Sequence, residues 1–374
     1  MANANNLIHR EPFEEHVMLA PAPPVARKGR GAVSNLQGRY EINGRERFYD
    51  GWQDEDEAAP AFKTVVTDEV AKTILSRNTS PDIPFSVSLN PYRGCEHGCI
   101  YCFARPSHAY HDLSPGLDFE SRLFAKPDAA ALLRAELAKP GYVVAPMALG
   151  TNTDPYQPIE TDWRVTRGVI EVLAETDHPL GITTKSDRVG RDLDLLAPMA
   201  AKGLASVTLS ITSLDPRIAA TLEPRAPTPE RRLTAVRRLA DAGIPVNVSI
   251  APVIPAITDH EIERLVARAA EAGAQRVFFL PVRLPWEVAP LFRAWLDAHF
   301  PDRAGKVMAT IQSLRGGRDN DAGFFTRMQG QGPWADLIRT RIAIACRKHD
   351  INRERVPLRR DLFRPPRGPQ GELF

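Results

Sequence analysis

Short apolar runs alternate with helix-like segments along the middle of the chain. Six runs of strand length occur, and helix signals separate several of them. They span residues 86–90, 142–149, 180–184, 204–211, 245–251 and 276–280. Strands that alternate with helices pair in parallel through right-handed crossovers, so the pattern predicts a parallel α/β sheet. Six strands are too few for a closed eight-stranded barrel.

Several helices have recognisable boundaries. One begins at Pro229 and ends before Gly243, because proline suits the first helical position and glycine suits a helix end. A second is predicted to start with a capping box of Thr258 and Glu261 and to end before Gly273. A third starts near residues 161–162, and two more are expected near 286–299 and 334–349.

The chain divides into four expected parts. Residues 1–63 form an N-terminal extension that is partly disordered or draped over the surface, and contact of its basic residues 27–30 with phosphate is an open alternative. Residues 64–284 form the barrel. Residues 285–351 form a C-terminal helical cover, and 352–374 form a basic, proline-rich tail. Because residues 311–374 contain 13 Lys or Arg against 7 Asp or Glu, this end could touch an anionic substrate or be a solvated surface.

Composition narrows the class of protein. The 374 residues are 43% hydrophobic and 25% charged, which is ordinary for a soluble globular protein. A net charge of +2 gives no global field that favours nucleic acid. The sequence has no apolar run near the ~20 residues that span a bilayer and does not begin with a signal-peptide pattern. We therefore expect a cytoplasmic protein without a membrane partner.

Three of the four cysteines, Cys95, Cys99 and Cys102, lie within one short stretch. Clustered thiols in a sequence of this type are better explained as metal ligands than as disulfide partners. Three cysteines leave one iron of a [4Fe–4S] cube without a protein ligand. A non-catalytic zinc or iron–sulfur module is the alternative, in which His97, His108 or His111 would supply a fourth ligand.

The spacing C-x3-C-x2-C, with Tyr101 before the last cysteine, resembles the signature of radical S-adenosylmethionine (SAM) enzymes. The longer stretch 90–105 resembles the branch related to spore photoproduct lyase, and the likeness extends from about residue 64 to 282. The resemblance implies a partial (β/α)6 barrel with a [4Fe–4S] cluster on the three cysteines. It also implies SAM on the open iron, and an external one-electron reductant of the flavodoxin or ferredoxin type that drives reductive cleavage of SAM.

The resemblance also assigns SAM-binding roles to residues at the ends of the strands and in the cysteine motif. Thr151, Asn152 and Thr153 are assigned to the methionine amino group. Lys185 and Ser210 are assigned to the carboxylate and the ribose. Tyr101 and Phe103 are assigned to the adenine. Thr and Asn after a strand also suit turns and helix caps, which leaves the first assignment open.

The substrate is less well defined, and no catalytic side chain is assigned. The resemblance points to a lyase that repairs a DNA lesion, but residues 142–156 contain no cysteine to act as that lyase's hydrogen donor. A radical SAM enzyme that modifies protein or RNA is therefore an alternative. The last five residues resemble peptides that dock on the bacterial sliding clamp, with Gln370, Leu373 and Phe374 as contacts.

Overall fold

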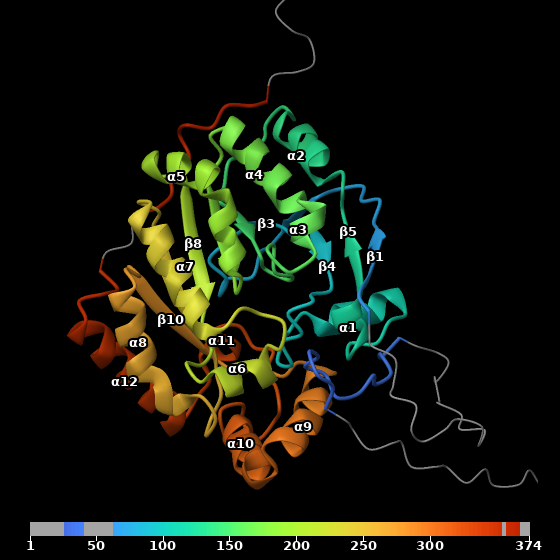
Figure 1. Cartoon of the computed structure of the whole chain (residues 1–374), viewed down its shortest axis with the longest axis vertical. Helices are drawn as coiled ribbons and strands as arrows, with labels where there is room; N and C mark the ends of the chain where they lie inside the picture. Colours follow the sequence, from blue (N-terminus) through green and yellow to red (C-terminus); the bar gives the residue numbers. More distant parts are fainter. Residues whose placement is uncertain (1–25, 41–62, 354–356, 367–374) are drawn as a thin grey trace, which may run out of the picture.

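The computed structural model describes residues 26–40, 63–353 and 357–366 of the chain. Its centre is a seven-stranded sheet in the order β10-β9-β8-β7-β6-β3-β2 (Figure 1). The strands are β2 (Leu75–Arg77), β3 (Val87–Leu89), β6 (Met147–Leu149), β7 (Leu180–Thr184), β8 (Ala205–Ser210), β9 (Val246–Val253) and β10 (Arg276–Pro281). All neighbours pair in parallel except β2, which runs antiparallel to β3 at one edge.

The six predicted strands are confirmed as the parallel part of this sheet, and the partial barrel is the observed fold. The run 142–149 was predicted too long, since β6 begins only at Met147. Pro146 precedes it and has no N–H to donate to a neighbouring strand. A second sheet in the order β1-β5-β4 was not predicted, because its strands are only two to four residues long. They are β1 (Val65–Asp68), β4 (Tyr92–Arg93) and β5 (Arg122–Ala125).

Helices cover the outer face of the main sheet (Figure 1). Apolar side chains of α2, α4, α5, α7, α8 and α12 join those of the strands in one core. Their bounds are α2 (Ala129–Leu137), α4 (Val165–Glu175), α5 (Leu193–Ala201), α7 (Pro229–Asp241), α8 (Ile262–Glu271) and α12 (Pro333–Lys348). Cys346 of α12 is buried there, as expected for a small apolar residue.

The inner face of the sheet differs from the outer face. Strand side chains alternate between the two faces, and those that point away from the helices are mostly small or polar and several are partly exposed. This inner set includes Thr183, Thr208, Ser210, Asn247 and Phe278. A face without large aliphatic side chains is not a packed core, so it leaves polar groups available at the concave side of the sheet.

A second core lies below the carboxyl ends of the strands (Figure 1). It packs Cys99, Ile100 and Tyr101 against α9 (Val288–His299) and α10 (Pro301–Ser313). The cysteine stretch is thereby enclosed between the barrel and the C-terminal helices. Short helices complete this end: η1 (Arg105–His111), α1 (Asp118–Ser121), α3 (Glu160–Trp163), η2 (Asp187–Asp192), α6 (Pro216–Leu222), η3 (Asp259–Glu261) and α11 (Thr326–Gln329). None of the helices within the described ranges is both long and apolar enough to cross a bilayer.

The predicted capping box at Thr258 and Glu261 is wrong. The hydroxyl of Thr258 accepts from the backbone N–H of Ile254 at 2.9 Å, and Glu261 accepts from the hydroxyl of Ser213 at 2.5 Å. The preceding loop thus takes the side chain of Thr258, a residue distant in sequence takes that of Glu261, and α8 starts only at Ile262. The helix predicted near 161 is divided as α3 and α4 because Arg164 between them has φ 51°.

Gly150 joins β6 to the loop that holds three predicted SAM contacts. The close approach of Gly150 to the end of β7 can be tested by substitution. Gly150 has φ +84°, and a Cβ there would lie 2.0 Å from Thr183 O. Gly141 has a similar φ of +78° but nothing within 4 Å. We expect Gly141→Ala to cost about 1–2 kcal/mol of unfolding free energy and Gly150→Ala about 1–3 kcal/mol more. Urea denaturation measures both, and equal losses would contradict the crowding.

Candidate active site

The cysteine loop, residues 94–104, connects β4 to η1 at the carboxyl end of the sheet. Two turns close it through the hydrogen bonds Gly98 N to Cys95 O and Cys102 N to Cys99 O, each 3.2 Å. Gly94 and Gly98 have φ of +70° and +66°, and a Cβ on Gly94 would lie 2.8 Å from Phe119 O. The loop therefore needs glycine at both positions, as expected for backbone wrapped closely around a ligand.

The three thiols of the loop are close enough to influence one another. Cys95 and Cys99 are buried, Cys102 is half-buried, and all three are free. Burial raises the pKa of Cys99 to about 12, with Glu223 and Cys102 adding to the rise and Lys185 opposing it. Burial also raises the pKa of Cys95, and the negative charges of Asp154 and the other two thiolates raise it further. Buried thiols with a raised pKa give up their protons when a positive metal centre binds them.

A single metal ion does not suit the arrangement. Across residues 26–40, 63–353 and 357–366, no three His, Cys, Asp or Glu side chains are grouped so as to hold one ion. Cys346, the fourth cysteine, lies apart on α12, where its sulfur is 3.3 Å from Asn352 Nδ2. Cys346 is therefore not a fourth sulfur ligand beside the three cysteines of the loop.

A fully buried ion pair fixes the backbone of the cysteine loop. Arg105 donates from Nε to Cys99 O at 2.9 Å and from Nη2 to Gly98 O at 3.0 Å. The same guanidinium pairs with Glu120 at 2.5 Å, and neither side chain is exposed. The loop has no neighbouring strand to donate hydrogen bonds to these carbonyls. Arg105 donates them instead, so it fixes the backbone of the loop.

The N-terminal segment 26–40 lies against the same loop. Gly31 N and Ala32 N donate to the carboxylate of Glu120 at 3.0 and 2.9 Å. A Cβ on Gly31 would lie 1.9 Å from Gly98 O, so only glycine fits this approach. Arg30 is buried and donates to Glu120 O at 2.6 Å. This arginine of the basic patch therefore contacts the protein's own backbone.

The loop after β6 is tied to the residue before the cysteine loop. Asn90 Oδ1 accepts from the backbone N–H of Asn152 at 2.9 Å and of Thr153 at 3.4 Å. Its Nδ2 donates to the hydroxyl of Thr151 at 3.1 Å, while the hydroxyl of Thr153 donates to Tyr92 O at 3.0 Å. The predicted residues Thr151, Asn152 and Thr153 are thus brought beside the cysteine loop, with Asn90 as the link.

Asp154 connects the cysteine loop to the end of β7. Its Oδ1 accepts from the hydroxyl of Thr184 at 2.6 Å and its Oδ2 from the backbone N–H of Lys185 at 2.7 Å. His97, which is fully buried between the first two cysteines, places Nδ1 3.3 Å from Asp154 Oδ2. Burial works to raise the pKa of Asp154, but His97 and the hydrogen bonds outweigh it and lower that pKa to about 2. The carboxylate is therefore ionised, and it fixes the backbone position of Lys185 at the end of β7.

Tyr101 belongs to a buried polar network at the ends of β8 and α6. Its hydroxyl donates to Glu223, which also accepts from the hydroxyl of Thr212 at 2.6 Å. Glu223 forms a buried ion pair with Arg232, whose Nη1 donates to Ser210 O at 3.0 Å. Burial works to raise the pKa of Glu223, but Arg232 and Lys185 outweigh it and lower that pKa to about 2. The network orients Tyr101 and fixes the backbone of Ser210.

Lys185 and Phe103 complete the predicted SAM contacts. The Lys185 ammonium lies 5.7 Å from the centre of the Tyr101 ring. Burial lowers its pKa, but Cys99 and Glu223 raise it more, so the group stays cationic. Phe103 is 51% exposed and points away from the buried network, with the Arg283 guanidinium 6.0 Å from its ring centre.

Sequence analysis missed several groups that shape the site. Arg105 and Glu120 gave no signal, because their main partners are backbone atoms and each other. Gln157 accepts from Glu96 N at 2.9 Å and donates to Gly94 O at 3.2 Å, although it had been noted only as part of a polar loop. The position of such a residue after a strand was the only available signal. The tail contacts Gln370, Leu373 and Phe374 lie outside the described residues.

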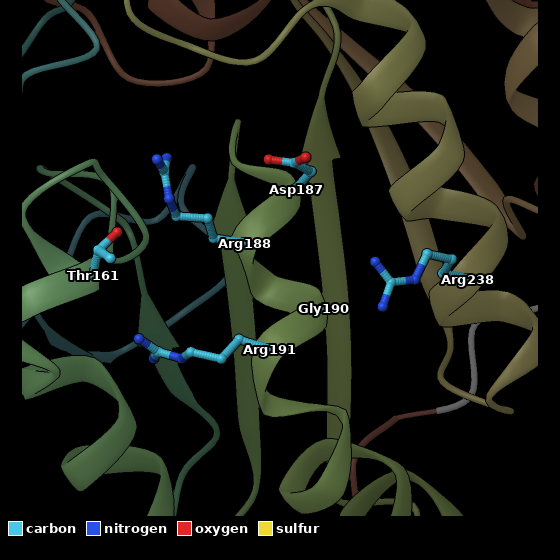
Figure 2. A pocket seen from close by; sticks show the side chains of 6 residues that line it. All are labelled: Thr161, Asp187, Arg188, Gly190, Arg191 and Arg238. Carbon is cyan, nitrogen blue, oxygen red and sulfur yellow. The ribbon is translucent and has the colours of Figure 1, made fainter.

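A separate pocket of about 360 Å³ lies on the outer flank, between η2 and α7 (Figure 2). Arg191 in it is committed to Glu160 at 2.7 Å and Asp192 at 2.8 Å, and Asp187 pairs with Arg231 at 2.6 Å. None of the cysteine loop lines this pocket. Its charges therefore hold surface elements together and are not part of the candidate active site.

The sequence and the fold together define the class of protein. The profile of the radical SAM superfamily matches residues 89–269, which include the cysteine loop and most of the barrel. The chain is also 38% identical over 248 residues to the uncharacterized protein Rv2578c of Mycobacterium tuberculosis, covering 65% of this chain and 73% of the relative. This chain belongs to the radical SAM superfamily. Members of that superfamily use a [4Fe–4S] cluster and SAM.

More distant relatives extend the likeness. The uncharacterized protein MJ0683 of Methanocaldococcus jannaschii is 29% identical over 173 residues, which cover 46% of this chain and 62% of that protein. Spore photoproduct lyase complexed with dinucleoside spore photoproduct is similar in structure, with a TM-score of 0.52, 16% identity, and coverage of 76% and 79% of the two chains. A mutant of that lyase with bound AdoMet matches with a TM-score of 0.51 at the same identity and coverage. These structures support the fold.

The buried Arg105–Glu120 pair can be tested by truncating one partner. Arg105→Met should lower the unfolding free energy by about 3–5 kcal/mol, because Glu120 would be left charged and buried. Arg134→Met, which breaks a half-exposed pair with Glu175, should cost less than about 1 kcal/mol. Urea denaturation of the purified variants measures both. If the two losses were alike, Arg105 would not be the group that fixes the loop.

Proposed function

We propose that Cys95, Cys99 and Cys102 hold the [4Fe–4S] cluster of this radical SAM protein. The observation that carries the proposal is the set of three free thiols on one loop, two of them buried. When bound, the cluster and SAM would supply the one-electron cleavage of SAM, which yields methionine and a 5′-deoxyadenosyl radical able to abstract hydrogen. An external reductant of the flavodoxin or ferredoxin type supplies the electron.

In this proposal the ends of the strands receive SAM. Lys185, cationic and fixed by Asp154, attracts the SAM carboxylate. The hydroxyls of Thr151 and Ser210 face the same end of the sheet as hydrogen-bonding groups for the amino group and ribose. Tyr101 precedes the last cysteine and offers a ring face to the adenine. The closed network around Glu223 keeps Tyr101 in place and excludes water from that side.

We propose further that the substrate is a nucleic acid and that the reaction is lyase-like, as in repair of a DNA lesion. The likeness to spore photoproduct lyase, whose structure contains a dinucleoside spore photoproduct, supports this choice. The polar inner face of the sheet offers hydrogen-bonding groups to a substrate at the cysteine loop. Cys346 is buried on α12 and so does not serve as the hydrogen donor to that face.

Replacing one cysteine tests the cluster assignment. Anaerobically reconstituted protein should hold about four irons per chain and release 5′-deoxyadenosine from SAM in the presence of dithionite. Cys99→Ala should lose most of the iron and all of the SAM cleavage, because a cube on two thiolates is not retained. Cys346→Ala should keep both. Iron analysis and chromatography of the products are the measurements; one zinc per chain, or unchanged iron in Cys99→Ala, would refute the assignment.

Isotope transfer tests the substrate class. Oligodeoxynucleotides whose thymidines are deuterated at every carbon-bound position, and which carry ultraviolet-induced lesions, are incubated with reconstituted protein, SAM and dithionite. We expect mass spectrometry to find deuterium in 5′-deoxyadenosine, since the radical takes hydrogen from the substrate. Undamaged deuterated strands serve as the control. Deuterium transfer from a peptide or an RNA, with none from the lesion strands, would sink the DNA assignment and leave the radical chemistry standing.

A further inference from the structure

An arginine–aromatic surface lies next to the cysteine loop. We define it as Phe103, Arg283, Phe324, Phe325 and Arg327. The three phenylalanines are 51%, 53% and 57% exposed in chain order. Arg283 follows β10, and the last three residues lie in and before α11. The Arg283 guanidinium is 6.0 Å from the Phe103 ring centre, and that of Arg327 is 4.9 Å from the Phe324 ring centre.

Arg283 has no carboxylate of its own: Asp82, which raises its pKa, is paired with Arg327. Among the described residues Arg283 forms no ion pair, its Nη1 contacts only Met328 Sδ at 3.1 Å, and its Nε has no hydrogen-bond partner. Burial lowers its pKa, and the charge of Arg327 lowers it further. Arg327, by contrast, pairs with Asp82 at 2.5 Å. A half-buried cation without a counter-ion is arranged to receive an anion from outside.

Phe325, next to Phe324, has an unusual backbone conformation. Phe325 has φ +66°, a left-handed conformation that is unfavourable for a bulky residue. Its backbone N–H is fixed by Asp82 Oδ2 at 3.1 Å. Backbone strain at an exposed aromatic residue does not stabilise the fold, so it indicates a binding role.

We propose that this surface binds an unpaired nucleic-acid strand, with bases stacked on Phe324 and Phe103 and a phosphate on Arg283. The inference rests on the proposed function and names the form in which its substrate is held. Aromatic rings beside an arginine that has no ion pair suit single strands, because every base offers a flat face and the backbone offers anions. Bases in a duplex stack on each other, so they are not free to stack on protein rings. The excess of 13 cationic over 7 anionic side chains in residues 311–374 favours a polyanion.

The test is strand binding by the full-length, reconstituted protein. The probe is a fluorescein-labelled oligothymidylate of about ten nucleotides, measured by fluorescence anisotropy over a salt series. Phe324→Ala and Phe324→Leu should each weaken binding about tenfold, and Phe324→Trp should retain it, since only aromatic rings stack with a base. Arg283→Gln should lower the slope of log K against log salt by about 0.7, the loss of one phosphate contact.

Matched controls lie away from the surface. Leu337→Ala removes a side chain of α12 that is also 53% exposed, and Arg238→Gln removes an exposed arginine of the flank pocket (Figure 2). Neither should change the affinity or the salt slope. Iron content and circular dichroism show that each variant is folded.

Each outcome decides the inference. Salt-dependent strand binding that falls only in the Phe324 and Arg283 variants supports it. Absent binding, equal loss in the controls, or tighter binding of the same strand as a duplex or of poly-glutamate overturns it. Protein that cleaves SAM but binds no strand refutes this inference alone. Protein that binds the strand but neither holds iron nor cleaves SAM refutes the proposed function alone.

Discussion

Three thiols can share one inorganic cluster only if the loop that holds them keeps its shape before the cluster is bound. A loop has no ladder of backbone hydrogen bonds, and repulsion between thiolates would open it. Arg105 resolves this by donating to two carbonyls of the loop while it pairs with Glu120 in a fully buried position. The pair connects the loop to α1 and to the N-terminal segment, so the geometry of the site depends on it.

The ends of the strands are coupled to the same loop by single polar side chains. Asn90 holds the loop after β6, and Asp154 holds the start of the loop after β7 through Lys185 N. Glu223 holds the side chain of Tyr101, and its ion-pair partner Arg232 holds the backbone carbonyl of Ser210. Groups that stand far apart in the sequence are thereby fixed relative to the cysteines by hydrogen bonds and ion pairs. That arrangement leaves the inner face of the sheet polar and accessible.

Local pattern was enough to predict the parallel strands and the cysteine motif, because both are encoded by neighbours in the sequence. Apolar runs located β7, β8, β9 and β10 to within two residues. The capping box at Thr258 failed because Ile254 N and Ser213 took the side chains first, a competition that only the tertiary structure reveals. Arg105 and Glu120 were missed for the same reason. The short strands β1, β4 and β5 have too few residues to show a period.

The N-terminal segment has a consequence for how the protein matures. Residues 30–32 cross the cysteine loop so closely that Gly31 touches the carbonyl of Gly98, and they are fastened by Glu120, which is synthesised almost ninety residues later. The segment leaves the ribosome first but has nothing to dock on until α1 has formed. The cysteine loop therefore stays uncovered until α1 has been made, and docking of the segment afterwards works as a latch.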